Sequence, residues 1–283
     1  GFLLRQLHWV AGNAEIPRLA PLLRDPRLCE PAAAVLTTIG SEQAAAALAD
    51  NLKNASPETA PAIINAVAAC PAPDAARMLQ TFARHKNDSI RRAAQRALAA
   101  VGSAEAADRF FADLQTQNRQ GRTRAMQNAV LLARTLCADG QADTGASICR
   151  RLLDTATDTD REYPLNPIPA LDALVDCTGT GALPHIAGLL DSGDASRRRA
   201  VLRIAGRLPT ETVVPFLLEY AATAPAASRA DVLRFLAHTR DPGAAAFVVH
   251  GLDSPDAEVR RAAAEGLPAL GADTALQPLV RLT

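Results

Sequence analysis

Arginine carries almost all of the positive charge of this chain. Of its 30 basic residues only Lys53 and Lys86 are lysines, so 28 are arginines. The planar guanidinium group donates paired hydrogen bonds to carboxylates and phosphates, so arginines gathered on one surface would bind an acidic partner. A GC-rich genome would produce the same excess of arginine without any function, and the sequence leaves both explanations open.

The arginines are concentrated in segments that we predict to be the second helices of repeated helical pairs. Net charge is +2 over residues 88–101, +4 over 119–138, +4 over 194–207 and +2 over 226–240, although the whole chain has a net charge of zero. Two further second helices, 57–70 and 256–270, each carry −1. Pairing with neighbouring Asp residues, or packing of the arginine stems over apolar surface, would remove this excess. If it is exposed, the predicted partner contacts are Arg91, Arg92, Arg96, Arg122, Arg124, Arg197, Arg198 and Arg203.

The remaining residue types form no catalytic or metal-binding pattern. The five histidines are scattered over different repeats, and no His-Glu pair, Walker loop, GxSxG or CxxC motif is present. We expect the five cysteines to pack as small apolar residues. The alternative for Cys137 and Cys177, near the ends of successive second helices, is a disulfide bond. The sequence therefore predicts no catalytic residue, no metal site and no cofactor.

A period of 31 residues organises the C-terminal part of the chain. Residues 178–187, 209–218, 240–249 and 271–280 align with one another, and two longer intervals of 38 residues precede them. A fixed period of this length indicates one supersecondary unit stacked many times. Each unit reads as turn, helix, short turn and helix; in the last full unit Asp253 opens the inner turn and Gly271 closes the second helix.

Composition and period together predict an all-α fold. The chain is 48% hydrophobic but only 4% aromatic, and no long alternating stretch suggests a sheet. We predict a right-handed α-α superhelix, an α-solenoid of about eight helical pairs, that forms a single domain over residues 1–283. Both ends leave a helical pair incomplete, so we expect the chain to be a fragment of a longer protein.

These repeats resemble the HEAT-repeat family in its bacterial short-repeat form. Asp253 precedes an aliphatic-Arg-Arg-Ala run at residues 259–262, Asp191 stands seven residues before Arg198, and residues 90–94 repeat the run. The resemblance departs at Arg197, which takes the aliphatic position, and at Arg84, which stands where the Asp is expected. It implies a structural role for Asp253 and Arg260, linking neighbouring repeats, and a concave side lined by the second helices.

The resemblance implies a scaffold more than an enzyme, since most members of the family bind proteins. We predict a non-catalytic protein-interaction module that binds an acidic partner protein on its concave, arginine-rich face. The alternatives are nucleic-acid binding, for which these helices have few aromatic residues to stack on bases, and a non-catalytic segment of a larger exported enzyme. A membrane span is not predicted, because no apolar run reaches 18 residues. The sequence does not indicate a compartment.

Overall fold

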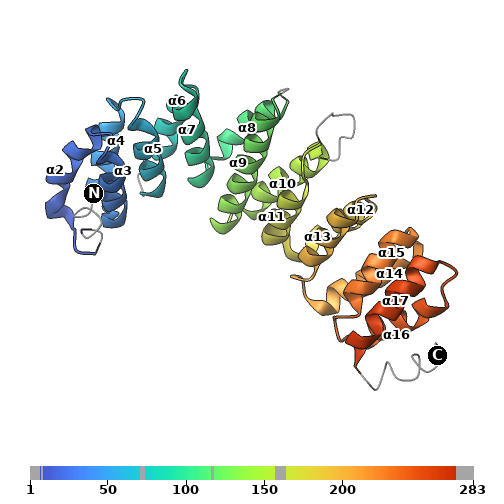
Figure 1. The fold of residues 1–283 in the computed structure, drawn as a ribbon. Helices are drawn as coiled ribbons and strands as arrows, with labels where there is room; N and C mark the ends of the chain where they lie inside the picture. Colours follow the sequence, from blue (N-terminus) through green and yellow to red (C-terminus); the bar gives the residue numbers. More distant parts are fainter. Residues whose placement is uncertain (1–6, 8, 71–73, 116–117, 157–163, 272–283) are drawn as a thin grey trace. The chain divides into compact units, whose positions relative to one another are not determined.

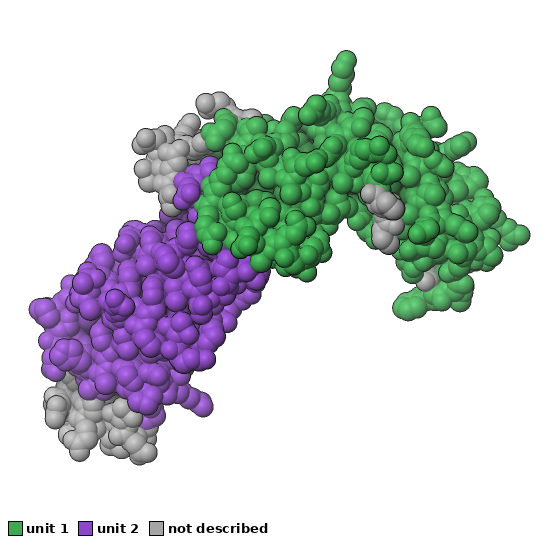
Figure 2. Space-filling model, turned by 180° about the vertical axis from the view of Figure 1, so that it is seen from behind, with its two compact units in different colours: residues 1–152, 160–165 green, residues 153–159, 166–283 purple. Residues whose placement is uncertain are grey.

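A computed structural model describes residues 7, 9–70, 74–115, 118–156 and 164–271 (Figure 1). These residues form α-helices joined by short turns and 3-10 helices, and none of them forms a strand. The all-α class predicted from the sequence is confirmed. The chain divides into two compact units, which Figure 2 colours separately: residues 1–152 with 160–165, and residues 153–159 with 166–283.

Unit 1 is built from successive helical pairs. Its first pair combines a broken first helix with α3, and the next pairs are α4 with α5, α6 with α7, and α8 with α9. The bounds are η1 (Asn13–Glu15), α2 (Ile16–Leu19), η2 (Ala20–Arg24), α3 (Cys29–Ile39), α4 (Glu42–Leu52), α5 (Ala60–Ala69), α6 (Ala75–Phe82), α7 (Asp88–Ala100), η3 (Ala104–Ala106), α8 (Ala107–Leu114) and α9 (Arg119–Ala138). The boundary between the units falls within α10 (Ala142–Ala156).

Unit 2 continues the same alternation. It contains α11, followed by the pairs α12 with α13, α14 with α15, and α16 with α17. The bounds are α11 (Ile168–Thr178), η4 (Gly179–Ala182), α12 (Leu183–Leu190), α13 (Ala195–Ala205), α14 (Thr210–Thr223), α15 (Ala226–Leu236), α16 (Pro242–His250), η5 (Gly251–Asp253), α17 (Ala257–Gly266) and η6 (Leu267–Leu270).

Within each unit the second helices pack directly on one another. In unit 1 this layer runs through α3, α5, α7 and α9, and in unit 2 through α11, α13, α15 and α17. Successive first helices touch far less, so each second helix is held by its own first helix and by its neighbours in the layer. The predicted handedness, the number of pairs, the single domain and the fragment status stay predictions.

Side-chain caps fix where the second helices begin. Asn87, Asn118, Asp194 and Asp256 each accept a hydrogen bond from the backbone N–H of the first turn that follows. Such a cap satisfies a donor that has no partner inside the helix. Gly102 follows the end of α7 with a φ of 71°, a left-handed conformation that glycine adopts without strain. The caps therefore confirm the inner turn predicted before residue 257.

The cysteines divide between the two roles that the sequence left open. Cys29, Cys70 and Cys149 are free and buried, so they pack as small apolar side chains. Cys137 and Cys177 are disulfide-bonded. Burial, followed by the neighbouring charge of Glu30, raises the pKa of the Cys29 thiol to about 11.

Candidate functional site

An arginine stands four residues after the cap in several second helices. In four of these helices its guanidinium group donates to backbone carbonyls that precede its own helix, which holds the turn in place. Arg91 donates to the carbonyls of His85 and Lys86 at 3.1 and 3.3 Å. Arg260 donates to those of Ser254 and Pro255 at 2.8 and 2.9 Å. The residues at this position are Arg91, Arg122, Arg198, Arg229 and Arg260.

Two of the predicted partner contacts are buried. Arg198 is 4% exposed, and its Nε donates to Oδ2 of Asp231 on the next second helix at 2.7 Å. Arg122, at the same helix position, is 7% exposed. Because both side chains are buried, they offer little surface to a partner, and Arg198 turns instead toward its inner turn and the adjacent helix. Arg198 does link neighbouring repeats, the role that the resemblance implied for Arg260.

The remaining predicted arginines of unit 1 are accessible to differing degrees. Asp88 pairs with both Arg91 and Arg92, but Arg91 is also held by the turn carbonyls, whereas half of the Arg92 side chain is exposed. Arg96, one helical turn further along α7, is exposed. Arg92 and Arg124 line one cavity of about 200 Å3 between α7, α8 and α9. Arg92, Arg96 and Arg124, which we call the α7–α9 arginines, are therefore the accessible candidates in this unit.

In unit 2 several arginines form ion pairs with carboxylates of the neighbouring second helix. Arg207 donates to Asp172 and Asp176 on α11. Arg234 on α15 donates to Glu265 on α17 at 2.8 Å. These three carboxylates offset part of the excess that the sequence showed over residues 194–207 and 226–240. Of the predicted contacts on α13, Arg203 is exposed and Arg197 is half-buried.

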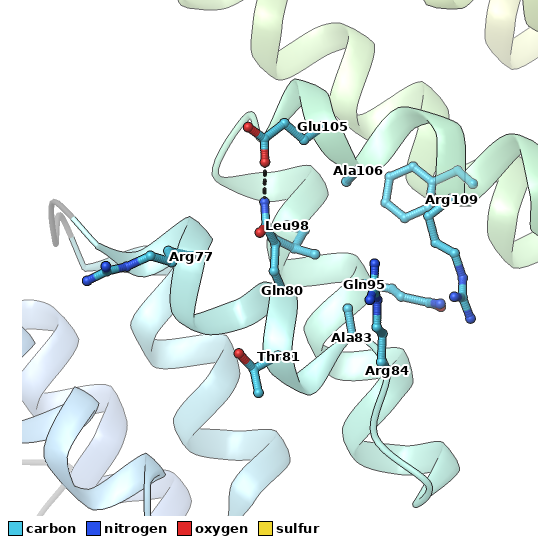
Figure 3. A pocket seen from close by; sticks show the side chains of 11 residues that line it. Arg77, Gln80, Thr81, Ala83, Arg84, Gln95, Leu98, Glu105, Ala106 and Arg109 are labelled. Carbon is cyan, nitrogen blue, oxygen red and sulfur yellow. Dashed lines mark hydrogen bonds between the residues drawn. The ribbon is translucent and has the colours of Figure 1, made fainter.

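A cleft that the sequence did not indicate lies between the first helices α6 and α8. It has a volume of about 690 Å3, and α7 contributes Gln95 and Leu98 to it (Figure 3). Its lining residues are Arg77, Gln80, Thr81, Ala83, Arg84, Gln95, Leu98, Glu105, Ala106, Arg109 and Phe110. We call this space the α6–α8 cleft. No sequence signal pointed to it, because it depends on how far two successive first helices stand apart.

Hydrogen bonds and one ion pair order the polar side chains of the α6–α8 cleft. Nε2 of Gln80 donates to Oε2 of Glu105 at 2.5 Å, which joins α6 to the start of the next repeat. Nε2 of Gln95 donates to Oδ2 of Asp113 at 3.1 Å, and Arg109 pairs with the same carboxylate at 3.3 Å. In Figure 3, Arg84, Gln95 and Arg109 lie on the same side of the cleft, away from the Gln80–Glu105 bond.

The described residues include no group of three or more His, Cys, Asp or Glu side chains that could hold a metal ion. Among the helices that the structure describes, none is long and apolar enough to cross a membrane.

Comparison with protein families identifies the repeat. Residues 224–283 match the family model described as HEAT repeats. Over this segment the chain is similar to HEAT repeats. The matched segment covers α15 and the α16–α17 pair, where Arg229 and Arg260 hold the turns before their helices. A comparison with curated proteins returned no match.

Several solved structures are similar to this chain at low identity. Human deoxyhypusine hydroxylase is 20% identical over 91% of this chain and 96% of its own, with a TM-score of 0.38. The complex of CpcE and CpcF of phycocyanin lyase from Nostoc sp. is 19% identical over 83% of this chain and 92% of its own, with a TM-score of 0.40. A Kap121p mutant is 14% identical over 94% of this chain and 39% of its own, with a TM-score of 0.44. These likenesses carry no argument about function.

Proposed function

We propose that this chain is a non-catalytic protein-binding scaffold. HEAT repeats support this role, since stacked helical pairs present an extended surface that neighbouring repeats build together. The partner surface that fits is acidic, because the accessible candidate contacts in unit 1 are the α7–α9 arginines. Arg197 and Arg203 extend the same proposal to unit 2.

The observation that carries the proposal is that Arg92 and Arg96 are exposed, and Arg124 partly exposed, without matching carboxylates. Only Arg92 has a carboxylate partner, Asp88, and that carboxylate is shared with Arg91. Arg96 and Arg124 make no ion pair within the residues that the structure describes. An unbalanced positive surface accelerates association with an acidic partner and stabilises the complex through charged hydrogen bonds.

A charge-reversal series tests the proposal. The wild-type chain, the variant Arg92→Glu/Arg96→Glu/Arg124→Glu and a control, Arg18→Glu/Arg24→Glu/Arg27→Glu, serve as baits in host lysate at low and high salt. The control reverses three exposed arginines of the first repeat, so it matches the change in net charge. We expect a defined protein to be retained by the wild type and the control at low salt, released at high salt, and not retained by the variant.

Two outcomes would contradict the proposal. Equal capture of the protein by all three baits would place its binding elsewhere on the chain. Nucleic acid in the eluate, with loss of all captured protein after nuclease treatment, would instead favour nucleic-acid binding, whose steep salt dependence is expected from phosphate contacts.

A further inference from the structure

We propose that the α6–α8 cleft is a second binding site, which takes an extended acidic segment of a protein. This inference does not rest on the proposed function, because none of the α7–α9 arginines lines the cleft. Its volume of about 690 Å3 is within the usual range for a site that encloses a small ligand or a short piece of chain.

The charge of the cleft indicates an anionic occupant. Three arginines line it, against one carboxylate, Glu105. Arg77 pairs with Asp74 at 3.2 Å and Arg109 with Asp113 at 3.3 Å; Arg77 is well exposed and Arg109 is about half exposed. Ion pairs at such exposed positions contribute little, so an incoming carboxylate can replace them at small cost.

Arg84 is the strongest single contact for such a carboxylate. It is exposed, and it makes no ion pair with any residue that the structure describes. Arg109 lies on the same side of the cleft, with Gln95 (Figure 3). Two guanidinium groups on one side can hold acidic side chains by charged hydrogen bonds, whereas the side closed by Gln80 and Glu105 would repel them.

The two glutamines suit the backbone of a peptide. Each donates its Nε2 to a carboxylate, Gln80 to Glu105 and Gln95 to Asp113, which fixes the side-chain amide. The amide oxygen of each then remains as an acceptor, and backbone N–H groups of an extended segment are donors that match it. Main-chain hydrogen bonds combined with side-chain contacts are the usual means of holding an extended peptide.

The lining favours a peptide over a nucleic acid. Binding of single strands relies on aromatic faces on which bases stack. Phe110 is the aromatic residue of this cleft, and it is 1% exposed, so its ring offers no face to a base. Leu98 is 3% exposed and is buried in the same way, so polar and charged side chains form the accessible lining of the cleft.

Peptide selection on the full chain tests the inference. A random linear-peptide library displayed on phage is panned against the wild type, and a selected peptide is then synthesised and titrated by fluorescence anisotropy. We expect enrichment in Asp and Glu, and at least about tenfold weaker binding to Arg84→Glu/Arg109→Glu, because two charged hydrogen bonds are lost. Arg84→Lys/Arg109→Lys, which keeps the charge but not the fork geometry, is expected to retain part of the affinity.

Two further variants separate this site from the rest of the surface. Arg18→Glu/Arg24→Glu matches the change in net charge and should bind the peptide as the wild type does. Arg92→Glu/Arg96→Glu/Arg124→Glu should also bind it fully, so loss of the captured partner and loss of the peptide are distinguishable. Circular dichroism and the thermal midpoint check that Arg84→Glu/Arg109→Glu is folded.

Any of three results would overturn the inference. The first is that panning enriches no acidic peptide. The second is that the selected peptide binds Arg84→Glu/Arg109→Glu as tightly as the wild type. The third is that oligodeoxythymidylate of equal charge displaces the peptide at equal concentration, which would assign the cleft to nucleic acid.

Discussion

Arg198 on α13 and Asp231 on α15 form a buried ion pair between successive repeats. Nε of Arg198 lies 2.7 Å from Oδ2 of Asp231, and the two side chains are 5% and 6% exposed. Nη1 of the same arginine donates to the carbonyl of Ser192 at 2.7 Å, so this guanidinium joins its own inner turn to the next helix. Removing one partner of such a pair leaves an uncompensated buried charge, which costs about 3–5 kcal/mol.

We therefore predict that Asp231→Ala lowers the free energy of unfolding of the chain by about 3–5 kcal/mol. The matched control is Glu265→Ala, which removes the half-exposed one of the two acidic partners of Arg234; Asp231 itself is the other. Exposed pairs contribute about 0–1 kcal/mol, so the control should change little. Urea unfolding followed by circular dichroism measures both variants. Equal destabilisation by the two substitutions would contradict a special role for the buried pair.

Gly266, the last residue of α17, packs against Ala237, the C-cap residue of α15. A Cβ atom placed on it would lie 2.8 Å from Cβ of Ala237, which is shorter than real carbon contacts allow. We predict that Gly266→Ala destabilises the chain by about 1–3 kcal/mol, the usual cost of overpacking a core. The thermal midpoint of unfolding measures this loss.

Gly188 provides the opposite case for the same substitution. It lies in the exposed part of α12, and nothing stands within 4 Å of a Cβ placed there. Gly188→Ala should stabilise the chain by up to about 1 kcal/mol, because alanine has the higher helix propensity. If both alanine variants shift the midpoint in the same direction, the packing argument at Gly266 is wrong.

Tyr220 should make stability depend on pH in the alkaline range. Its burial, followed by the hydrogen bond that its hydroxyl donates to Asp191 at 2.8 Å, raises its pKa from 10.0 to about 12. Since the folded pKa is the higher one, this stabilisation is complete below the unfolded pKa and is lost as pH rises toward the folded value.

A native-state titration followed by tyrosinate absorbance checks that prediction. The chain has two tyrosines, and we expect a late component that Tyr220→Phe removes. If the component that the variant loses titrates instead near the ordinary pKa of tyrosine, burial and the hydrogen bond to Asp191 do not protect Tyr220.

The repeat period predicted the fold because it fixes the turns, and the turns fix the helices. Asp256 caps α17 where the sequence placed an inner turn, and Gly271, predicted to close the second helix, has a φ of 90°. Each of these positions depends on one local residue. An Asp side chain accepts hydrogen bonds at the start of the helix, and a glycine adopts a positive φ after its end.

The accessible surface could not be predicted in the same way, because it depends on the rotation of each helix. Arg91 and Arg92 are adjacent, yet one holds the inner turn and the other reaches solvent, since each residue advances a helix by a little more than a quarter of a turn. A net charge summed over a whole helix counts both kinds of arginine equally, so it does not indicate which of them are accessible. The α6–α8 cleft could not be predicted for a related reason: the spacing of two first helices leaves no pattern in the sequence.

The cysteines give a further prediction that the sequence alone left open. Three of the five, Cys29, Cys70 and Cys149, are free and buried, and Cys137 and Cys177 are disulfide-bonded. In denaturant without reductant we expect three thiols per chain to react with a thiol reagent, rising to five after reduction. Five reactive thiols before reduction would exclude the disulfide bond.

In the folded chain we expect Cys29 to resist alkylation at mildly alkaline pH. Two effects act together: its side chain is 1% exposed, and its pKa of about 11 keeps the thiolate, the reactive species, scarce. Its Sγ donates to the carbonyl of Thr59 on the neighbouring repeat at 3.6 Å, so reaction requires α3 and α5 to separate.

Mass spectrometry of alkylated peptides measures the rate of alkylation at Cys29. Thr59→Pro, which is expected to disturb the start of α5, should raise that rate. Modification of Cys29 in the folded wild type as fast as in denaturant would show that neither burial nor the raised pKa protects this thiol.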